Sequence, residues 1–248
     1  MDDILTCQHI SAGYGRITVL SDLSLRVERG QTLGIIGPNG SGKTTLLHTL
    51  SGVIVPSRGK IRFEGQNISS LSPDARCRLG IGRTFQVPRP FGRMKVFENA
   101  LAAAAFGNGS SRRESWAEAE KALERTHLTD KKDIRAGELN LLDRKRLEIA
   151  RAIATRPKVL LLDEIAAGLT SAEVSGILEI VGGLKEDGLT VVWIEHIMET
   201  MLQAADVLVC MAEGRIVISG PPAEVLGSRE VEELYLGGAR EEARDADG

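Results

Sequence analysis

The stretch from residue 37 to residue 45 constrains this chain more than any other part of it. It reads Gly-Pro-Asn-Gly-Ser-Gly-Lys-Thr-Thr and fits the pattern G-x-x-x-x-G-K-[ST] at every fixed position. The apolar residues 33–36 before it predict a buried strand, and residues 44–50 after it predict a helix. Glycines let main-chain N–H groups and a helix N-terminus point at one anion. We therefore expect a phosphate-binding loop, the alternative being a glycine-rich turn that binds nothing.

The chemistry of this loop assigns roles to two of its side chains. We expect the Lys43 ammonium to reach the β- and γ-phosphates of a nucleotide, and the Thr44 hydroxyl to be a ligand of Mg²⁺. The candidate residues for ATP binding in this stretch are Gly37, Pro38, Asn39, Gly40, Ser41, Gly42, Lys43, Thr44 and Thr45.

A second chemical signal is an apolar strand at 159–164 that ends in two carboxylates, Asp163 and Glu164. The carboxyl end of such a strand in a parallel sheet lies at the crevice where ligands bind. We expect Asp163 to hold Mg²⁺, directly or through water, and Glu164 to orient and deprotonate the attacking water. The alternative is a strand whose terminal acids are only solvated.

Composition limits the classes of function. The 248 residues are 42% hydrophobic, enough for a large core, and the net charge of −3 argues against nucleic acid as a partner. Cys7, Cys77 and Cys210 match neither zinc nor disulfide spacing, which is typical of a cytosolic protein. Apolar runs fall far short of the roughly 20 residues of a membrane span, and the start, Met-Asp-Asp, lacks the positive charge of a signal peptide. We expect a soluble protein whose membrane role comes through partners.

Hydrophobic periodicity changes along the chain. The first 90 residues carry strand patterns, with a period-two alternation at 23–27. The pattern is helical over 91–154, and a buried strand is expected again at 158–163. The other expected strands are 60–64, 190–195 and a hairpin of 207–211 with 215–219.

Two expected helices carry start signals. Thr170 and Glu173 fit a capping box, and Ser72-Pro73 fits an N-cap followed by proline at the first helical position. Two further helices carry apolar faces that indicate packing rather than a cofactor site. These faces are Trp116, Ala119, Leu123 and His127 in one helix, and Leu141, Leu147 and either Ile149 or Ala150 in the other.

From near the N-terminus to about residue 236, the order of these motifs resembles the nucleotide-binding subunit of an ABC transporter. Gln86, in Arg-Thr-Phe-Gln, resembles the glutamine of the family's Q-loop, which contacts Mg²⁺ or the attacking water. His196 resembles the switch histidine that contacts the γ-phosphate, and Tyr14 resembles the aromatic residue that stacks on adenine. Each residue alone has an ordinary structural explanation, whereas their order around the phosphate motifs favours the functional one.

The resemblance implies an α/β fold: a P-loop NTPase (RecA-like) core with an antiparallel β subdomain and an inserted α-helical subdomain. Residues 1–236 would form a single nucleotide-binding domain. Within it, 1–90 and 155–236 would form the core and β subdomain, and 91–154 the helical subdomain, followed by a polar tail at 237–248.

The chain departs from the family at the signature segment, usually Leu-Ser-Gly-Gly-Gln, which pins the γ-phosphate of ATP held by the opposite subunit. Residues 139–143 read Leu-Asn-Leu-Leu-Asp. Asn140 can replace serine as N-cap and hydrogen-bond donor, so it is a candidate ATP contact. The leucine side chains at 141 and 142 would hinder close approach of the main chain to phosphate.

Subfamily features point to a transport system. Leu-Glu-Ile-Ala-Arg after the signature, Ala-Ala-Gly-Leu after Glu164 and Arg-Thr-Phe-Gln at Gln86 are similar to LivG-type ATPases of branched-chain amino acid uptake. The resemblance implies ATP and Mg²⁺ as cofactors and a peripheral place at the cytoplasmic face of the inner membrane. The implied partners are a second nucleotide-binding subunit (a LivF-type heterodimer or a homodimer), two transmembrane permeases and, indirectly, a periplasmic solute-binding protein.

Three alternatives remain open from the sequence. The chain could serve an importer of urea or short amides, with lipids the least favoured solutes. It could be a soluble ABC ATPase uncoupled from transport, although repair and translation members have coiled-coil insertions or two cassettes. The altered signature also fits a module that binds ATP without useful turnover.

Overall fold

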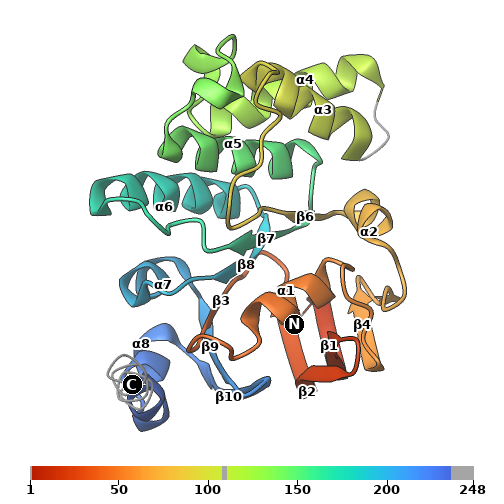
Figure 1. Ribbon diagram of the computed structural model, residues 1–248, viewed down its shortest axis with the longest axis vertical. Helices are drawn as coiled ribbons and strands as arrows, with labels where there is room; N and C mark the ends of the chain where they lie inside the picture. The colour runs from red at the N-terminus through yellow and green to blue at the C-terminus, as the bar shows by residue number, and fades with distance from the viewer. Residues whose placement is uncertain (1, 108–110, 236–248) are drawn as a thin grey trace. The chain divides into compact units, whose positions relative to one another are not determined.

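The computed structural model describes residues 2–107 and 111–235 (Figure 1). The chain divides into two compact units, one built from residues up to Ser70 and from Trp193 onward, the other from Leu71–Val192. Strand β8 (Thr190–Ile194) runs across this division. The polar tail predicted at 237–248 lies outside the described residues, and the subdomain limits drawn from the sequence stay predictions.

The first unit contains the antiparallel sheet predicted for the N-terminal part. Inward-facing Leu23, Leu25 and Val27 alternate with polar residues, so one face of the second strand is buried. Its first two strands are long and pair antiparallel along their length. The strand order is β2-β1-β4-β5, with bounds β1 (Asp3–Tyr14), β2 (Ile17–Glu28), β4 (Arg58–Phe63) and β5 (Gln66–Asn67).

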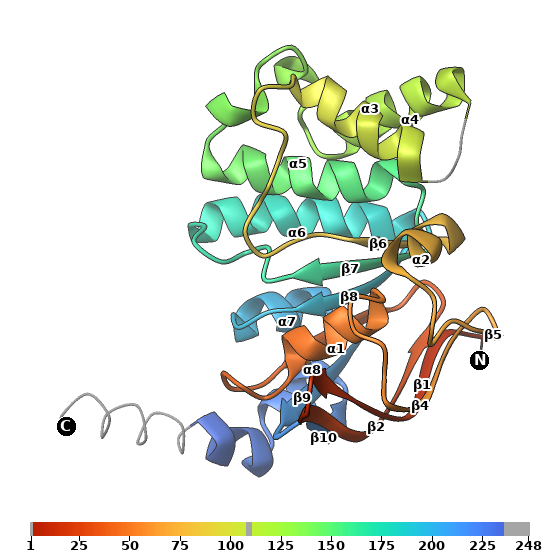
Figure 2. The same cartoon turned by 45° about the vertical axis from the view of Figure 1, so that its right-hand side comes forward.

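The same unit contains parallel α/β structure (Figure 2). Strand β3 (Thr32–Ile36) is buried at every residue and pairs in parallel with β9 (Val207–Ala212). Strand β9 pairs antiparallel with β10 (Arg215–Gly220), which confirms the predicted hairpin. The labelled helices of this unit are α1 (Lys43–Leu50), α7 (Met198–Ala204) and α8 (Pro222–Leu226), and residues 229–235 are also helical.

The second unit has its own parallel pair, β6 (Ile81–Arg83) with β7 (Val159–Asp163). Before it lies α2 (Pro73–Leu79), whose N-cap is Ser72 and whose first residue is proline, as predicted. After it lies α6 (Ser171–Glu186), where both hydrogen bonds of the Thr170–Glu173 capping box are present.

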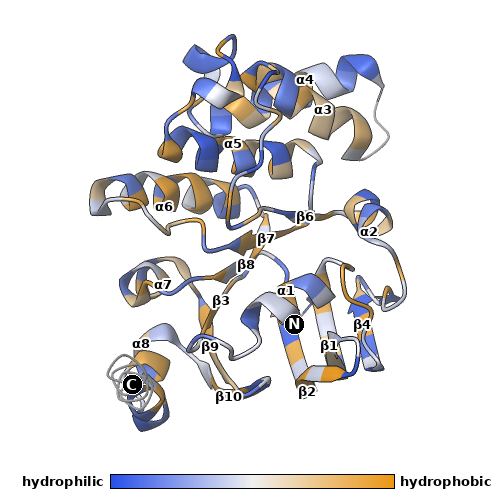
Figure 3. Cartoon of the chain, in the orientation of Figure 1, coloured by the Kyte–Doolittle hydropathy of each residue, from blue (hydrophilic) through white to orange (hydrophobic). Residues whose placement is uncertain are grey.

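The rest of the second unit is helical: α3 (Val96–Gly107), α4 (Arg112–Arg125), α5 (Leu141–Ala154) and the short 3₁₀ turns η1 (Thr129–Lys131) and η2 (Ala136–Glu138). Figure 3 shows that α3 is mostly apolar and α4 mostly hydrophilic. Alanines at the contacts let the helices pack closely. Their shared core is Val96, Ala100, Ala104, Ala119, Ala122, Leu123, Leu128, Ala136, Leu139, Leu147, Ala150 and Ala154.

Three residues of the predicted apolar faces are not buried. Trp116 is 47% exposed, and its ring packs against Phe97 with centroids 4.6 Å apart. His127 is exposed, because α4 ends at Arg125 and the chain then turns through a positive φ of 56° at His127. Leu141 is 45% exposed, because it lies in the first turn of α5, where the chain still faces solvent. Within the described ranges, each helix is too short or too polar to span a bilayer.

Candidate functional site

The predicted phosphate loop leaves the buried end of β3 and enters α1. Gly37 has φ 150°, and a Cβ there would lie 2.2 Å from the carbonyl oxygen of Met211, so only glycine fits. Gly40 and Gly42 have positive φ values of 77° and 99°, and Gly42 is the N-cap of α1. The N-terminus of α1 therefore opens directly into the loop, and its N–H groups favour an anion.

Lys43 places its ammonium group inside this loop. Its Nζ donates hydrogen bonds to the carbonyl oxygens of Gly37 (2.7 Å) and Pro38 (2.9 Å) and lies 3.4 Å from Ser41 Oγ. The residue is only 5% exposed. A buried ammonium at a helix N-terminus makes a strongly electropositive cradle.

The other loop residues differ in exposure. Asn39, Gly40 and Thr44 are exposed, so the Thr44 hydroxyl is accessible at the mouth of the loop. Ser41 and Thr45 are buried and belong to the framework of the turn. The loop therefore has one side that faces solvent and another that is packed against the rest of the unit.

Tyr14 lies beside α1. The ring is half exposed, a hydrogen bond of 3.0 Å joins Tyr14 Oη to His48 Nδ1, and the two rings meet edge-on with centroids 6.5 Å apart. Sequence reasoning missed His48 because it carried no motif. The contact holds an exposed aromatic surface, suited to stacking on a base, in the same unit as the phosphate loop.

His196 follows β8 in the same unit as the loop, and it is exposed. Its position depends on Glu195, a buried residue whose main-chain N–H donates to the Ile35 carbonyl (3.3 Å). The Glu195 carboxylate accepts hydrogen bonds from Trp193 Nε1 (3.2 Å) and His196 N (3.3 Å). This predicted switch residue thus extends from a segment fixed beside β3.

In the second unit, Asp163 ends β7 and is 4% exposed. Its carboxylate lies 3.1 Å from Arg83 Nη2, and its main-chain N–H donates to Thr84 Oγ1 (3.2 Å). Arg83 ends the neighbouring strand β6. Asp163 thus offers a buried carboxylate paired with arginine, and carboxylate oxygens are ligands suited to a hard cation.

Glu164, the next residue, has a left-handed backbone with φ 46°. A non-glycine residue in this region is strained by about 1–3 kcal/mol, and such strain is common at functional sites. Gln86 Nε2 donates to Glu164 Oε2, and Lys145 Nζ donates to the Glu164 carbonyl oxygen (3.2 Å). The structure thus brings the Gln86 and Glu164 side chains into contact.

Asn140 is the N-cap of α5, as predicted. Its Oδ1 accepts a hydrogen bond from the Asp143 main-chain N–H at 2.8 Å. The Asp143 carboxylate is buried and pairs with Lys131 Nζ (2.6 Å) and Arg146 Nη1 (3.5 Å). Asn140 is exposed, so the altered signature presents a capped helix N-terminus to solvent.

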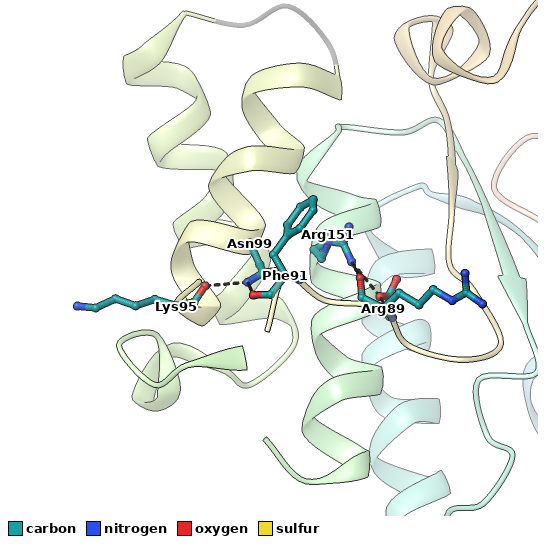
Figure 4. Close-up of polar contacts among 6 residues, drawn as sticks. Arg89, Phe91, Lys95, Asn99 and Arg151 are labelled. Atoms are coloured by element: carbon teal, nitrogen blue, oxygen red, sulfur yellow. Dashed lines mark hydrogen bonds and ion pairs between the residues drawn. The ribbon is translucent and has the colours of Figure 1, made fainter. Parts of the chain in front are cut away.

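Figure 4 shows how the segment after the predicted Q-loop is held. From α3, Asn99 accepts from the Phe91 N–H (2.8 Å) and donates to the Lys95 carbonyl (2.9 Å). From α5, Arg151 Nη1 donates to the Arg89 carbonyl (3.1 Å), and its guanidinium lies 5.2 Å from the centre of the Phe91 ring. The Phe91 ring stays 53% exposed, an apolar surface on a rigidly supported turn.

The predicted residues thus form two sets. Tyr14, residues 37–45 and His196 belong to the first unit, and Gln86, Asn140, Asp163 and Glu164 belong to the second. Within the second unit, Gln86 contacts Glu164, and α5, which Asn140 caps, reaches Glu164 through Lys145.

Solved structures share this fold over nearly the whole chain. A nucleotide-free ATP-binding cassette from an ABC transporter is 32% identical, with a TM-score of 0.83 and coverage of 94% of this chain and 98% of that one. An ATP-binding cassette in its ADP conformation is 33% identical, with a TM-score of 0.85 and coverage of 96% and 100%. The predicted fold class, an α/β P-loop core with an antiparallel β subdomain, is confirmed, and fold and loop together define a nucleotide-binding cassette.

The family follows from the sequence match. The model of the family described as ABC transporter matches residues 20–167, and this chain belongs to that family. It is an ABC ATPase cassette.

Curated relatives cover almost the full chain but differ in role. The LivG protein of Archaeoglobus fulgidus, a probable branched-chain amino acid transport ATP-binding protein, is 35% identical, covering 94% of this chain and 95% of its own length. The corresponding high-affinity protein BraF of Pseudomonas aeruginosa is 34% identical, covering 95% and 98%. The lipopolysaccharide export ATP-binding protein LptB of Haemophilus influenzae is 33% identical, covering 94% and 97%. Identity alone does not separate import from export.

Proposed function

We propose that this chain powers an ABC transporter by binding ATP on residues 37–45 and hydrolysing it. The observation that carries the proposal is the Lys43 ammonium inside a glycine loop at a helix N-terminus, in a chain of this family. The loop amides and Lys43 bind the phosphates, and Tyr14 stacks on adenine. The exposed ring of Tyr14 supports that role.

The hydrolytic residues of the proposal are Glu164, Gln86 and His196. Glu164 deprotonates the attacking water, Gln86 orients it, and His196 contacts the γ-phosphate. Support comes from the hydrogen bond of Gln86 to the Glu164 carboxylate, which fixes the base before a substrate arrives.

The donor set fits Mg²⁺. Thr44 offers a hydroxyl, Gln86 an amide oxygen and Asp163 a carboxylate, and hard oxygen ligands are those that Mg²⁺ prefers. The accessibility of Thr44 supports this assignment. When bound, the ion neutralises charge on the phosphate groups.

The proposed assembly has two nucleotide-binding subunits, LivF-type partner or second copy, and two permeases at the cytoplasmic face of the inner membrane. Asn140 would face the ATP held by the other nucleotide-binding subunit. The region of residues 86–106 would dock a permease, and the exposed ring of Phe91 supports this. A periplasmic solute-binding protein would take part only indirectly.

Import of branched-chain or related amino acids is the solute role that we favour. The LivG and BraF relatives support it, together with the Arg-Thr-Phe-Gln sequence at Gln86. Lipopolysaccharide export is a second candidate, because LptB relatives match equally well over the same length.

Purification of the tagged chain from its native membranes tests the assembly. We expect two permeases and a second nucleotide-binding subunit to co-purify, and a strain that lacks the chain to lose leucine uptake. Normal uptake together with loss of lipopolysaccharide from the cell surface would instead favour export. Purification without any membrane protein would contradict transport.

The altered signature predicts asymmetry in a heterodimer whose partner has an ordinary signature. The site built on this chain's own phosphate loop should then be the more active one, because it uses the partner's signature. Glu164→Gln should remove most of the ATPase activity of the complex, by about 10²-fold or more at that site. If the equivalent change in the partner causes all of the loss, the asymmetry is wrong.

A further inference from the structure

The back of the phosphate loop is built by the C-terminal part of the chain. The Met211 carbonyl lies where a side chain on Gly37 would be, at 2.2 Å from the Cβ position. The Gly214 N–H, in the turn between β9 and β10, donates to the Ser41 carbonyl (3.0 Å). These two contacts place the β9–β10 hairpin directly against the loop.

A third contact comes from still further along the chain. The main-chain N–H of Gly37 donates a hydrogen bond to Tyr235 Oη at 3.0 Å, across 198 residues of sequence. With Lys43 Nζ on its carbonyl, Gly37 is therefore held at both of its main-chain polar groups.

Tyr235 is anchored for this contact. Residues 231–235 are helical, and Val231, one helical turn before Tyr235, is 2% exposed. Residues four apart share a helix face, so burial of Val231 directs Tyr235 inward. Ser228 starts this turn, since its Oγ donates to the Val225 carbonyl (2.7 Å) and accepts from Val231 N (3.3 Å).

The chemistry of the phenol suits a fixed acceptor. Burial raises the pKa of Tyr235, so the group stays neutral at physiological pH. Its oxygen then accepts the Gly37 N–H while adding no negative charge next to a loop that binds phosphates.

We propose that Tyr235 is a positioning residue for nucleotide binding, whose hydroxyl holds the first residue of the phosphate loop in the binding conformation. This inference rests on the nucleotide site proposed above. Lys43 must turn from the loop carbonyls toward phosphate when a nucleotide binds, whereas Tyr235 keeps its hold on Gly37. The affinity for nucleotide thereby depends on how the C-terminal segment is docked.

Calorimetry with Mg-ADP on the full chain tests this role. Tyr235→Phe removes only the hydroxyl, so the nucleotide-free loop can leave the binding conformation. We expect the dissociation constant to rise by up to about fivefold, the limit set by one neutral hydrogen bond. Arg229→Ala is the matched control: it removes only an exposed ion pair with Glu233 on the same helical turn, so the affinity should stay that of the wild type. Equal affinity of Tyr235→Phe and wild type would overturn the inference.

Hydrogen exchange on the wild-type chain gives a readout that needs no variant. The Gly37 amide should exchange slowly both with and without Mg-ADP, and Tyr235→Phe should speed it in the nucleotide-free chain. If the Gly37 amide of the wild type exchanges at the rate of an unprotected amide, the inference about Tyr235 is wrong. If that same wild-type chain still binds ADP, the proposed nucleotide site is unaffected. Failure of the wild type to bind ADP would remove both.

Discussion

The guanidinium of Arg83 lies 3.1 Å from the carboxylate of Asp163, and the side chains are only 9% and 5% exposed. Arg83 and Asp163 are the last residues of the neighbouring parallel strands β6 and β7. The ion pair therefore joins the carboxyl ends of these two strands, and it includes the carboxylate predicted to bind metal. Removal of one partner from a buried ion pair leaves the other charge poorly solvated.

Arg83→Met should therefore destabilise the chain by about 3 kcal/mol, which lowers the melting temperature by about 6–12 °C. Arg78→Met is the control, because Arg78 pairs with Asp74 on α2, where the two side chains are 54% and 64% exposed. The control should melt like the wild type. Equal melting of all three proteins would show that the buried pair does not stabilise the fold.

The cap of α5 predicts a difference between two small substitutions. The Asn140 side chain accepts from the Asp143 N–H, and loss of such a cap costs about 1 kcal/mol. Asn140→Ala should lower the melting temperature by about 2–4 °C, while Asn140→Ser, which restores the family's usual residue, should keep it. A serine variant as unstable as the alanine variant would contradict the capping role.

Glu148 joins α5 to the segment shown in Figure 4. Its carboxylate, on a residue only 3% exposed, accepts from the Arg89 main-chain N–H and from Arg151 Nη1, both at 2.9 Å. Glu148→Ala should cost about 1–3 kcal/mol, because it leaves these donors without that acceptor. Glu148→Gln keeps an acceptor oxygen and should cost less, as measured by denaturant unfolding.

The same residue predicts a pH dependence. Burial raises the pKa of the Glu148 carboxyl, while Arg151 and the Arg89 N–H act in the lowering direction. A raised pKa in the folded state means that the protonated form favours folding, and this contribution is lost as the pH rises through the folded pKa. The wild type should gain stability relative to Glu148→Gln as the pH falls from neutral toward the ordinary value of 4.5. A stability difference that shrinks or stays constant on acidification would contradict this sign.

Helix caps, tight turns and the phosphate loop could be predicted from the sequence, because each depends on residues that are close together in the chain. The Thr170–Glu173 box, the Asn140 cap and the β9–β10 hairpin are all set by local hydrogen bonding and turn residues, and all are present. The phosphate loop belongs to this class too, because its pattern fixes a strand, a turn and a helix in a single stretch.

Contacts between distant segments could not be predicted. Arg83 and Asp163 are 80 residues apart, and their pairing requires knowledge that β6 and β7 are neighbours. Tyr235 reaches Gly37 across 198 residues from a helical turn without a motif of its own. Both contacts result from tertiary packing, and the hydrophobic periodicity of a single segment contains no information about which distant segment it packs against.

Calorimetric titration of the full chain with Mg-ATP tests the central claim most directly. The wild type should bind ATP. Lys43→Ala should bind it roughly 100-fold more weakly, because the variant lacks the ammonium group that lies inside the loop and would contact the phosphates. Lys60→Ala, an exposed lysine on β4, should bind like the wild type. Absence of binding heat in the wild type, or equal affinity of wild type and Lys43→Ala, would contradict the account.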